Sequence, residues 1–196
     1  MSFFEKIDQT VFLWINGWVG RFSLLDQFAE LAASDYLIPV AISLVLLGLW
    51  FSGDTSSSRT TNQFAVMTAI VAVVIANLVV EASNEVFFRA RPYEILDSNV
   101  LFYKPTDSSF PSNPTAAGLA MGLSVWFWNK KPGRILIVIA LLLGIARVYV
   151  GVCYPFDVVG GATIALGAAL LSKWLLTRFQ LLPLTLLRSV RSIFLA

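Results

Sequence analysis

The chain has 196 residues, of which 57% are hydrophobic and only 13% are charged, and its mean hydropathy is +0.76. A soluble domain is about half apolar and about a quarter charged, so this composition predicts an integral membrane protein. The net charge of +2 gives no basis for nucleic-acid binding, and one cysteine excludes both an internal disulfide bond and a multi-cysteine metal site. The chain has no histidine, the commonest general base and metal ligand. We therefore expect neither a metal site nor a cofactor.

Residues 1–35 predict two short amphipathic helices that lie in the membrane interface. The apolar face of the first comprises Val11, Phe12, Ile15 and Trp18, and that of the second comprises Leu24, Leu25, Phe28, Leu31 and Ala32. Asp8 and Asn16 lie elsewhere on the first helix, and a break at 20–23 separates the two. One tilted spanning helix from residue 11 onward is the alternative, but three charged residues would interrupt it.

Five apolar segments follow, at residues 36–51, 64–88, 111–128, 135–150 and 158–176. Several are near the lower end of the roughly 17–25 residues that a span needs, and flanking helical turns can supply the rest. Turn-rich loops are expected at 52–62 and 129–133. Residues 177–196 mix leucine with arginine and predict a basic amphipathic helix at the interface. The fold class is thus a single all-α membrane domain with a bundle at 36–176, five spans, or six if the N-terminal region also crosses.

The charges predict the orientation of this bundle. Lysine and arginine gather in the loops at 52–62 and 129–134 and at the C-terminus, against Asp54 alone. The positive-inside rule places that side in the cytoplasm. The other side, with most of the acidic residues, is then extracytoplasmic, and it holds three polar stretches around Arg91, Ser112 and Arg147.

The first two polar stretches offer groups that suit a phosphate. Arginine binds phosphate with two parallel N–H groups, and we assign Arg91, directly before Pro92, to a pocket. For Arg89 we favour an anchor that reaches the lipid headgroups. Ser112 is expected to cap a helix whose first turn holds Asn113 and Pro114, and such a helix start binds phosphate readily. An ordinary helix start has the same sequence, and the small residues that follow are explained by close helix packing.

The third polar stretch, at 146–157, carries a cation, the single cysteine and a carboxylate. Arg147 lies at the end of one apolar segment and Asp157 lies just before the next. Because an unpaired charge at this depth is costly, Arg147 should find an anion. A salt bridge to Asp157 and a ligand phosphate are both compatible with the residues. The sequence therefore predicts one anion-binding pocket formed by all three stretches.

These stretches resemble the signature of the type 2 phosphatidic acid phosphatase superfamily of membrane lipid phosphatases, and in particular its short bacterial branch that acts on undecaprenyl diphosphate. The first motif of that family reads Lys, six residues, Arg-Pro, and here it reads from Asn84 to Arg91-Pro92. The second reads Pro-Ser-Gly-His or a close variant, and here it reads Pro111-Ser112-Asn113-Pro114. The third reads Ser-Arg, five residues, His, three residues, Asp, and here residues 146–157 match it. The resemblance covers roughly residues 64–168.

The resemblance implies roles for these residues and a location in the bacterial inner membrane. In the family, the third-motif histidine is the nucleophile, the aspartate orients it, and the second-motif histidine is the general acid. Cys153 and Pro114 stand at the histidine positions, Asn84 stands at the lysine position, and Asp157 is kept. The residues implied in phosphate binding are Arg91, Ser112, Asn113 and Arg147. The implied ligand is a membrane lipid phosphate or an isoprenoid diphosphate.

Two functional hypotheses follow from the missing histidines. The favoured one is a lipid-phosphate-binding protein with impaired or no hydrolysis. In the other, Cys153 replaces the nucleophile, although the carboxylate of Asp157 beside it disfavours the thiolate. A structural subunit of a larger membrane complex, with protein partners or a second copy, is a third hypothesis. A redesigned or inactivated form of an active phosphatase would also lack histidine.

Overall fold

The computed structural model describes residues 3–179, 183–185 and 187. Within them every regular element is a helix and no residue is in a strand, which confirms the all-α prediction. The helices are α1 (Phe3–Asn16), α2 (Ser23–Ala32), α3 (Leu37–Phe51), α4 (Ser56–Val86), α5 (Pro92–Ile95), α6 (Asn113–Trp128), α7 (Lys130–Tyr149) and α8 (Pro155–Arg178). The helix predicted at 177–196 lies largely outside the described residues.

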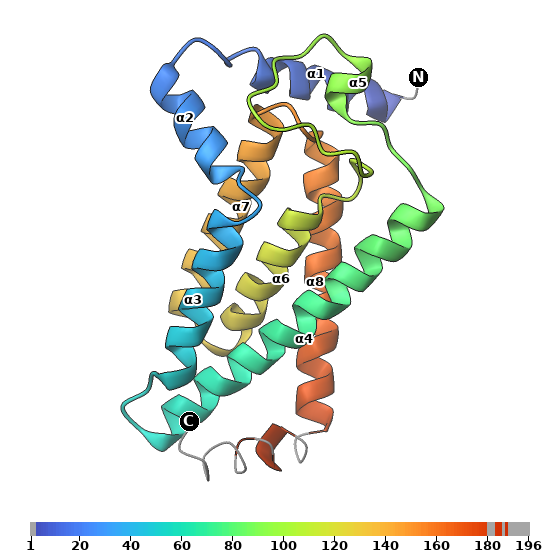
Figure 1. Ribbon diagram of the computed structural model, residues 1–196. Coiled ribbons are helices and arrows are strands. Elements are labelled where there is room, and N and C mark those ends of the chain that lie inside the picture. Colours follow the sequence, from blue (N-terminus) through green and yellow to red (C-terminus); the bar gives the residue numbers. More distant parts are fainter. Residues whose placement is uncertain (1–2, 180–182, 186, 188–196) are drawn as a thin grey trace.

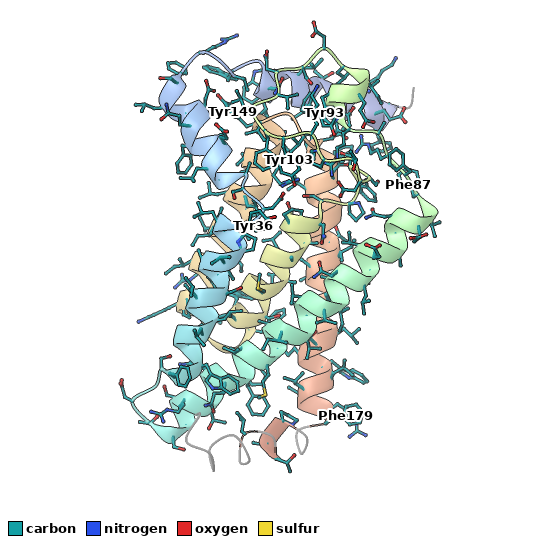
Figure 2. All side chains as sticks on the ribbon, viewed as in Figure 1. Tyr36, Phe87, Tyr93, Tyr103, Tyr149 and Phe179 are labelled. Atoms are coloured by element: carbon teal, nitrogen blue, oxygen red, sulfur yellow. The ribbon has the colours of Figure 1, made fainter. Side chains whose placement is uncertain are left out.

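Helix α6 lies at the centre of the bundle and contacts α3, α4, α7 and α8 (Figure 1). Helix α4 crosses the others at a tilt. Helix α1 lies across one end of the bundle, together with α5 and the long loop before α6. We call this the motif end, because all three motif stretches are there. Figure 2 shows Tyr93, Tyr103 and Tyr149 at the motif end and Phe179 at the opposite end, where the α3–α4 and α6–α7 turns lie.

Small side chains allow the helices to approach closely. A Cβ atom added to Gly118 on α6 would lie 3.1 Å from the Cβ of Ala140 on α7, and one added to Gly122 would lie 3.0 Å from the backbone nitrogen of Ile137. Helix α4 presents a buried stripe formed by Ala65, Ala69, Ala72 and Ala76. Small residues at helix contacts are typical of membrane bundles, so the packing explanation for the small residues of α6 is confirmed.

Two predicted loops are shorter than expected because helices extend into them. Helix α4 begins at Ser56, since the hydroxyl of Thr55 accepts a hydrogen bond from the backbone N–H of Ser58 at 3.1 Å and caps the helix. Helix α7 begins at Lys130, so the α6–α7 turn consists of Asn129 alone. The helices meet so closely there that a Cβ atom on Gly133 would lie 2.2 Å from the Cα of Trp126.

Helix α1 turns polar residues toward the bundle, and Phe12 of the predicted apolar face is buried with them. Asp8, Phe12 and Asn16, four residues apart, are 1%, 0% and 2% exposed, whereas Val11 and Trp18 are 39% and 40% exposed. The physical reason is that α1 covers the polar motif end rather than an apolar helix surface. The side-chain amide of Asn16 donates to the carbonyl oxygens of Asn99 and Tyr149 at 2.7 and 2.9 Å.

By length and hydropathy, α4, α7 and α8 can each cross a membrane, and α2 with α3 forms a pair bent by 56° that would make a fourth span. With 16 residues, α6 is about 24 Å long at 1.5 Å per residue, short of the hydrocarbon core. The protein is therefore an integral membrane protein with three or four such spans among its described residues. The predicted five or six spans are not confirmed.

Candidate functional site

The three motif stretches meet at a cavity of about 190 Å³ at the motif end. The predicted site residues that line it are Arg91, Ser112, Asn113, Pro114, Arg147 and Cys153. Asp157 and Asn84 do not line it. Asn84 is on the last turns of α4, and its buried side-chain oxygen has no hydrogen-bond partner among the described residues. We call the space the motif cavity.

Arg147 pairs with a carboxylate that the sequence did not suggest. Its guanidinium is on the last turn of α7, is 4% exposed, and donates from Nη1 to Oδ1 of Asp35 at 2.5 Å and to the carbonyl of Ala33 at 3.3 Å. The salt bridge to Asp157 that the sequence left open is therefore absent. Asp35 also lines the motif cavity and accepts a hydrogen bond from the hydroxyl of Tyr103. The only feature of the sequence that could have indicated this pair is the acidic residue at the break between α2 and α3.

Arg91 holds a loop in place with most of its donors. Its Nε and Nη2 donate to the backbone oxygen and to Oδ1 of Asp107 at 3.0 and 2.8 Å, and its Nη1 donates to the carbonyl of Val152 at 2.7 Å. The Asp107 side chain is 61% exposed, so a ligand phosphate could displace it into water. The sequence predicted the end of the second apolar segment at residue 88, close to the observed end of α4 at Val86, and Pro92 starts the short helix α5.

Arg89 was predicted to be a headgroup anchor, and this is wrong. Its guanidinium donates from Nη2 to Asp8 at 2.6 Å and from Nη1 to Asp157 at 2.5 Å, and it lies 4.2 Å from the ring centre of Tyr154. It therefore joins α1 to the start of α8.

The carboxylate of Asp157 is 0% exposed, and neighbouring donors use both of its oxygens. Oδ1 accepts from Arg89, while Oδ2 accepts from the hydroxyl of Ser109 at 2.5 Å and from the backbone N–H of Tyr154 at 2.7 Å. These bonds cap α8 and tie the loop just before the second motif to the third motif. In this arrangement Asp157 stabilises the loops, and no hydrogen bond joins it to Cys153 among the described residues.

The second motif begins a helix, as predicted, with Ser112 at the N-cap of α6. The hydroxyl of Ser112 shares a hydrogen bond with that of Thr115 at 2.9 Å. Pro114 is in the first turn and has no N–H. A proline at this position therefore lacks both the side-chain acid and the backbone donor that a histidine would provide.

Cys153 faces the motif cavity but is 1% exposed. Burial raises the pKa of its thiol to about 12, against the opposing effects of Arg147 and Arg91, and the charge of Asp157 raises it further. The thiolate is the nucleophilic form, so at neutral pH almost all of this cysteine is in the unreactive form.

The pKa of Cys153 can be tested by chemical modification. Because the thiolate exists only above the pKa, we expect the rate of alkylation by a small reagent to rise about tenfold per pH unit from pH 7 to 9.5 without levelling off. A free thiol, measured beside it, should level off near pH 8.5. A plateau near pH 8.5 would show an unperturbed thiol and a plateau at lower pH an activated one, and either result would contradict the raised pKa.

The charges that line the motif cavity balance, with Arg91 and Arg147 opposite Asp35 and Asp107. Each arginine already has a carboxylate partner, so an incoming phosphate has to compete with it. The arrangement can hold an anion, but on these residues it offers neither a histidine nor a thiolate for attack at phosphorus.

Comparison with known proteins shows the family and the fold of the chain. The model of the PAP2 superfamily matches residues 65–180. The chain is 34% identical to the undecaprenyl-diphosphatase BcrC of Bacillus subtilis (strain 168) over 80% of this chain and 77% of that protein. Its fold is similar to the crystal structure of LpxE from Aquifex aeolicus, with a TM-score of 0.69 and 29% identity over 85% of this chain and 94% of that one.

A second solved structure shows the same fold at lower identity. It is a PAP2-type phosphatidylglycerolphosphate phosphatase from Bacillus subtilis, with a TM-score of 0.61 and 22% identity over 91% of this chain and 89% of that one. The family match covers every residue that lines the motif cavity except Asp35. The chain belongs to the PAP2 superfamily and has its membrane lipid phosphatase fold.

Proposed function

We propose that this protein binds the phosphate of a membrane lipid, an isoprenoid diphosphate or a lipid phosphate, in the motif cavity and hydrolyses it poorly or not at all. The observation that carries the proposal is the cavity itself. It is lined by all three motif stretches and contains the buried guanidinium of Arg147, while the chain has no histidine. The relatives supply the ligand class, since BcrC of Bacillus subtilis is an undecaprenyl-diphosphatase.

Three features argue against efficient hydrolysis. The thiol of Cys153 is protonated at neutral pH, Pro114 has no proton to donate to a leaving group, and Asp157 is committed to the loops. A general acid contributes about 10²–10⁴-fold, and loss of a nucleophile costs at least as much. Together these losses remove several powers of ten in rate.

The alternative is an active phosphatase with Cys153 as the nucleophile. It is favoured by one observation, the position of Cys153 in the wall of the same cavity as Arg147. A diphosphate also has a good leaving group and could react without a general acid. A phosphate bound at Arg147 would meet this thiol first.

We place the motif cavity on the extracytoplasmic side of a bacterial inner membrane. Support comes from the first turns of α4 and α7 at the opposite end of the bundle, which carry Arg59, Lys130, Lys131 and Arg134. Positive residues of short loops favour the cytoplasmic side. The ligand would then be a lipid of the outer leaflet, with its phosphate at the extracytoplasmic surface of the membrane.

The test is binding measured beside turnover on the purified full chain in detergent. We expect a polyprenyl diphosphate to bind without phosphate release, and Arg147→Ala to abolish binding. Asp35→Asn should tighten binding about tenfold, because it removes the anion that competes for Arg147. Glu85→Gln removes the same charge from the motif end of α4, away from the cavity, and should leave the affinity unchanged.

Two other outcomes would contradict the proposal of binding without hydrolysis. Phosphate release that Cys153→Ser abolishes would establish the cysteine enzyme. Absence of binding in the unchanged chain and in Asp35→Asn would contradict the proposed function.

A further inference from the structure

A second cavity of about 440 Å³ lies next to the motif cavity, and aromatic rings form much of its wall. The rings belong to Phe4, Phe87, Phe110 and Phe156, which come from α1, the end of α4, the loop before α6 and the first turn of α8. We call it the phenylalanine pocket. Three charged residues, Glu5, Asp8 and Arg89, also line it, and Asp8 and Arg89 are paired with each other. The surface left for a ligand is therefore mainly apolar.

Phe110 is the wall between the two cavities. The residues on either side of it, Ser109 and Pro111, line the motif cavity, while Phe110 lines the phenylalanine pocket. Its ring packs on the backbone of α8, where a Cβ atom added to Gly160 would lie 2.4 Å from Cε2 of the ring. The ring of Phe87 meets it edge to face at 6.1 Å. A ligand that occupies both cavities has to pass along this ring.

The phenylalanine pocket opens to the outer surface of the bundle. Phe4 and Phe87 are 67% and 55% exposed, and Figure 2 shows Phe87 at the outer edge of the motif end of α4. Aromatic rings exposed at the membrane–water interface favour contact with lipid over water. An apolar chain can therefore reach the pocket from the bilayer, while a phosphate attached to it enters the motif cavity.

A larger apolar groove of about 550 Å³ between α3 and α4 is less suited to the same chain. It is lined by residues such as Leu47, Trp50, Val66 and Ile70. Val66 is 20 residues before the end of α4 at Val86, or about 30 Å along the helix at 1.5 Å per residue. Because α4 is tilted, the depth is smaller than this length, but the groove is formed by the second half of α3 and the first half of α4 and so lies in the part of the bundle away from the motif end.

We propose that the phenylalanine pocket binds the first part of the hydrocarbon chain of the lipid whose phosphate occupies the motif cavity. The inference rests on the proposed function, because it needs a phosphate at Arg147. The physical basis is that the lipid is amphiphilic and the two cavities adjoin. Its phosphate suits the polar motif cavity, and its hydrocarbon chain suits the apolar phenylalanine pocket. Burial of each methylene group against these rings favours binding, so affinity should depend on the chain as well as on the phosphate.

The experiment compares inorganic diphosphate with farnesyl diphosphate on the purified full chain. We expect the unchanged protein to bind farnesyl diphosphate at least tenfold more tightly. Phe87→Ala with Phe156→Ala should remove that advantage and leave the affinity for inorganic diphosphate unchanged. Leu47→Ala with Ile70→Ala truncates two similarly exposed side chains in the α3–α4 groove and should change neither affinity.

Phe87→Ala alone, at an exposed position beyond the end of α4, provides the same test if the double variant does not fold, with a smaller expected loss. Equal affinity of the unchanged chain for both ligands would overturn the inference and leave the phosphate site standing. So would a loss caused by the control pair instead of the phenylalanine pair. Absence of binding of either ligand would overturn the proposed function, and this inference with it.

Discussion

Replacement of both Cys153 and Pro114 by histidine is expected to raise phosphate release from a polyprenyl diphosphate by about 10⁴-fold or more over the unchanged chain. The reason is that the pair would restore a nucleophile and a general acid, each of which contributes about 10²–10⁴-fold or more. Both positions line the motif cavity, so the new side chains would face the same bound phosphate. The measurement is the initial rate of phosphate release in detergent.

The two single histidine variants are the matched controls. Cys153→His alone should gain part of the activity. Pro114→His alone should gain little, because a general acid cannot protonate the leaving group productively when no nucleophile attacks phosphorus. The new imidazole at position 153 would have to share Asp157 with Ser109, Tyr154 and Arg89, so the double variant should remain slower than an enzyme whose aspartate is uncommitted. A double variant that binds diphosphate but releases no phosphate would refute this prediction.

Loss of the carboxylate of Asp157 is expected to have the largest effect on stability. Asp157→Ala leaves the hydroxyl of Ser109 and the backbone N–H of Tyr154 without their acceptor and removes one of the two anions that Arg89 joins. Breaking a buried ion pair in this way costs about 3–5 kcal/mol. The expected result is a large fall in the thermal midpoint of the protein in detergent.

Asp107→Ala provides the contrast for that prediction. Its ion pair with Arg91 is at the surface, where the Asp107 side chain is 61% exposed, and such pairs contribute about 0–1 kcal/mol. Arg91 also keeps its bond to the carbonyl of Val152. Equal destabilisation by the two variants would mean that burial of Asp157 does not decide how much this residue contributes to stability.

The candidate site could be predicted from the sequence where its residues are close together in the chain. The spacing from Arg147 to Cys153 placed both side chains on the same cavity, and Ser112 before Asn113 and Pro114 marked a helix start that the structure contains. Such signals survive because helix caps and short turns depend on local geometry, whatever the rest of the fold does.

The partners of the charged groups could not be predicted in this way. Arg147 was expected to meet Asp157 or a ligand, and Arg89 was expected to reach the headgroups. In the structure Arg147 pairs with Asp35, 112 residues away, and Arg89 joins Asp8 and Asp157, 81 and 68 residues away. No periodicity or short motif encodes a contact of that separation.

The sequence by itself therefore determined the membrane class, the all-helical fold and several of the residues that line the motif cavity, because hydropathy and local spacing depend on nearby residues alone. Only the tertiary structure decided which charges neutralise one another, which face of α1 is buried, and how little of Cys153 is available as a thiolate. These properties depend on the low-dielectric space that distant segments enclose together. Burial there raises the thiol pKa to about 12, and it leads the two buried carboxylates, Asp8 and Asp157, to share one arginine.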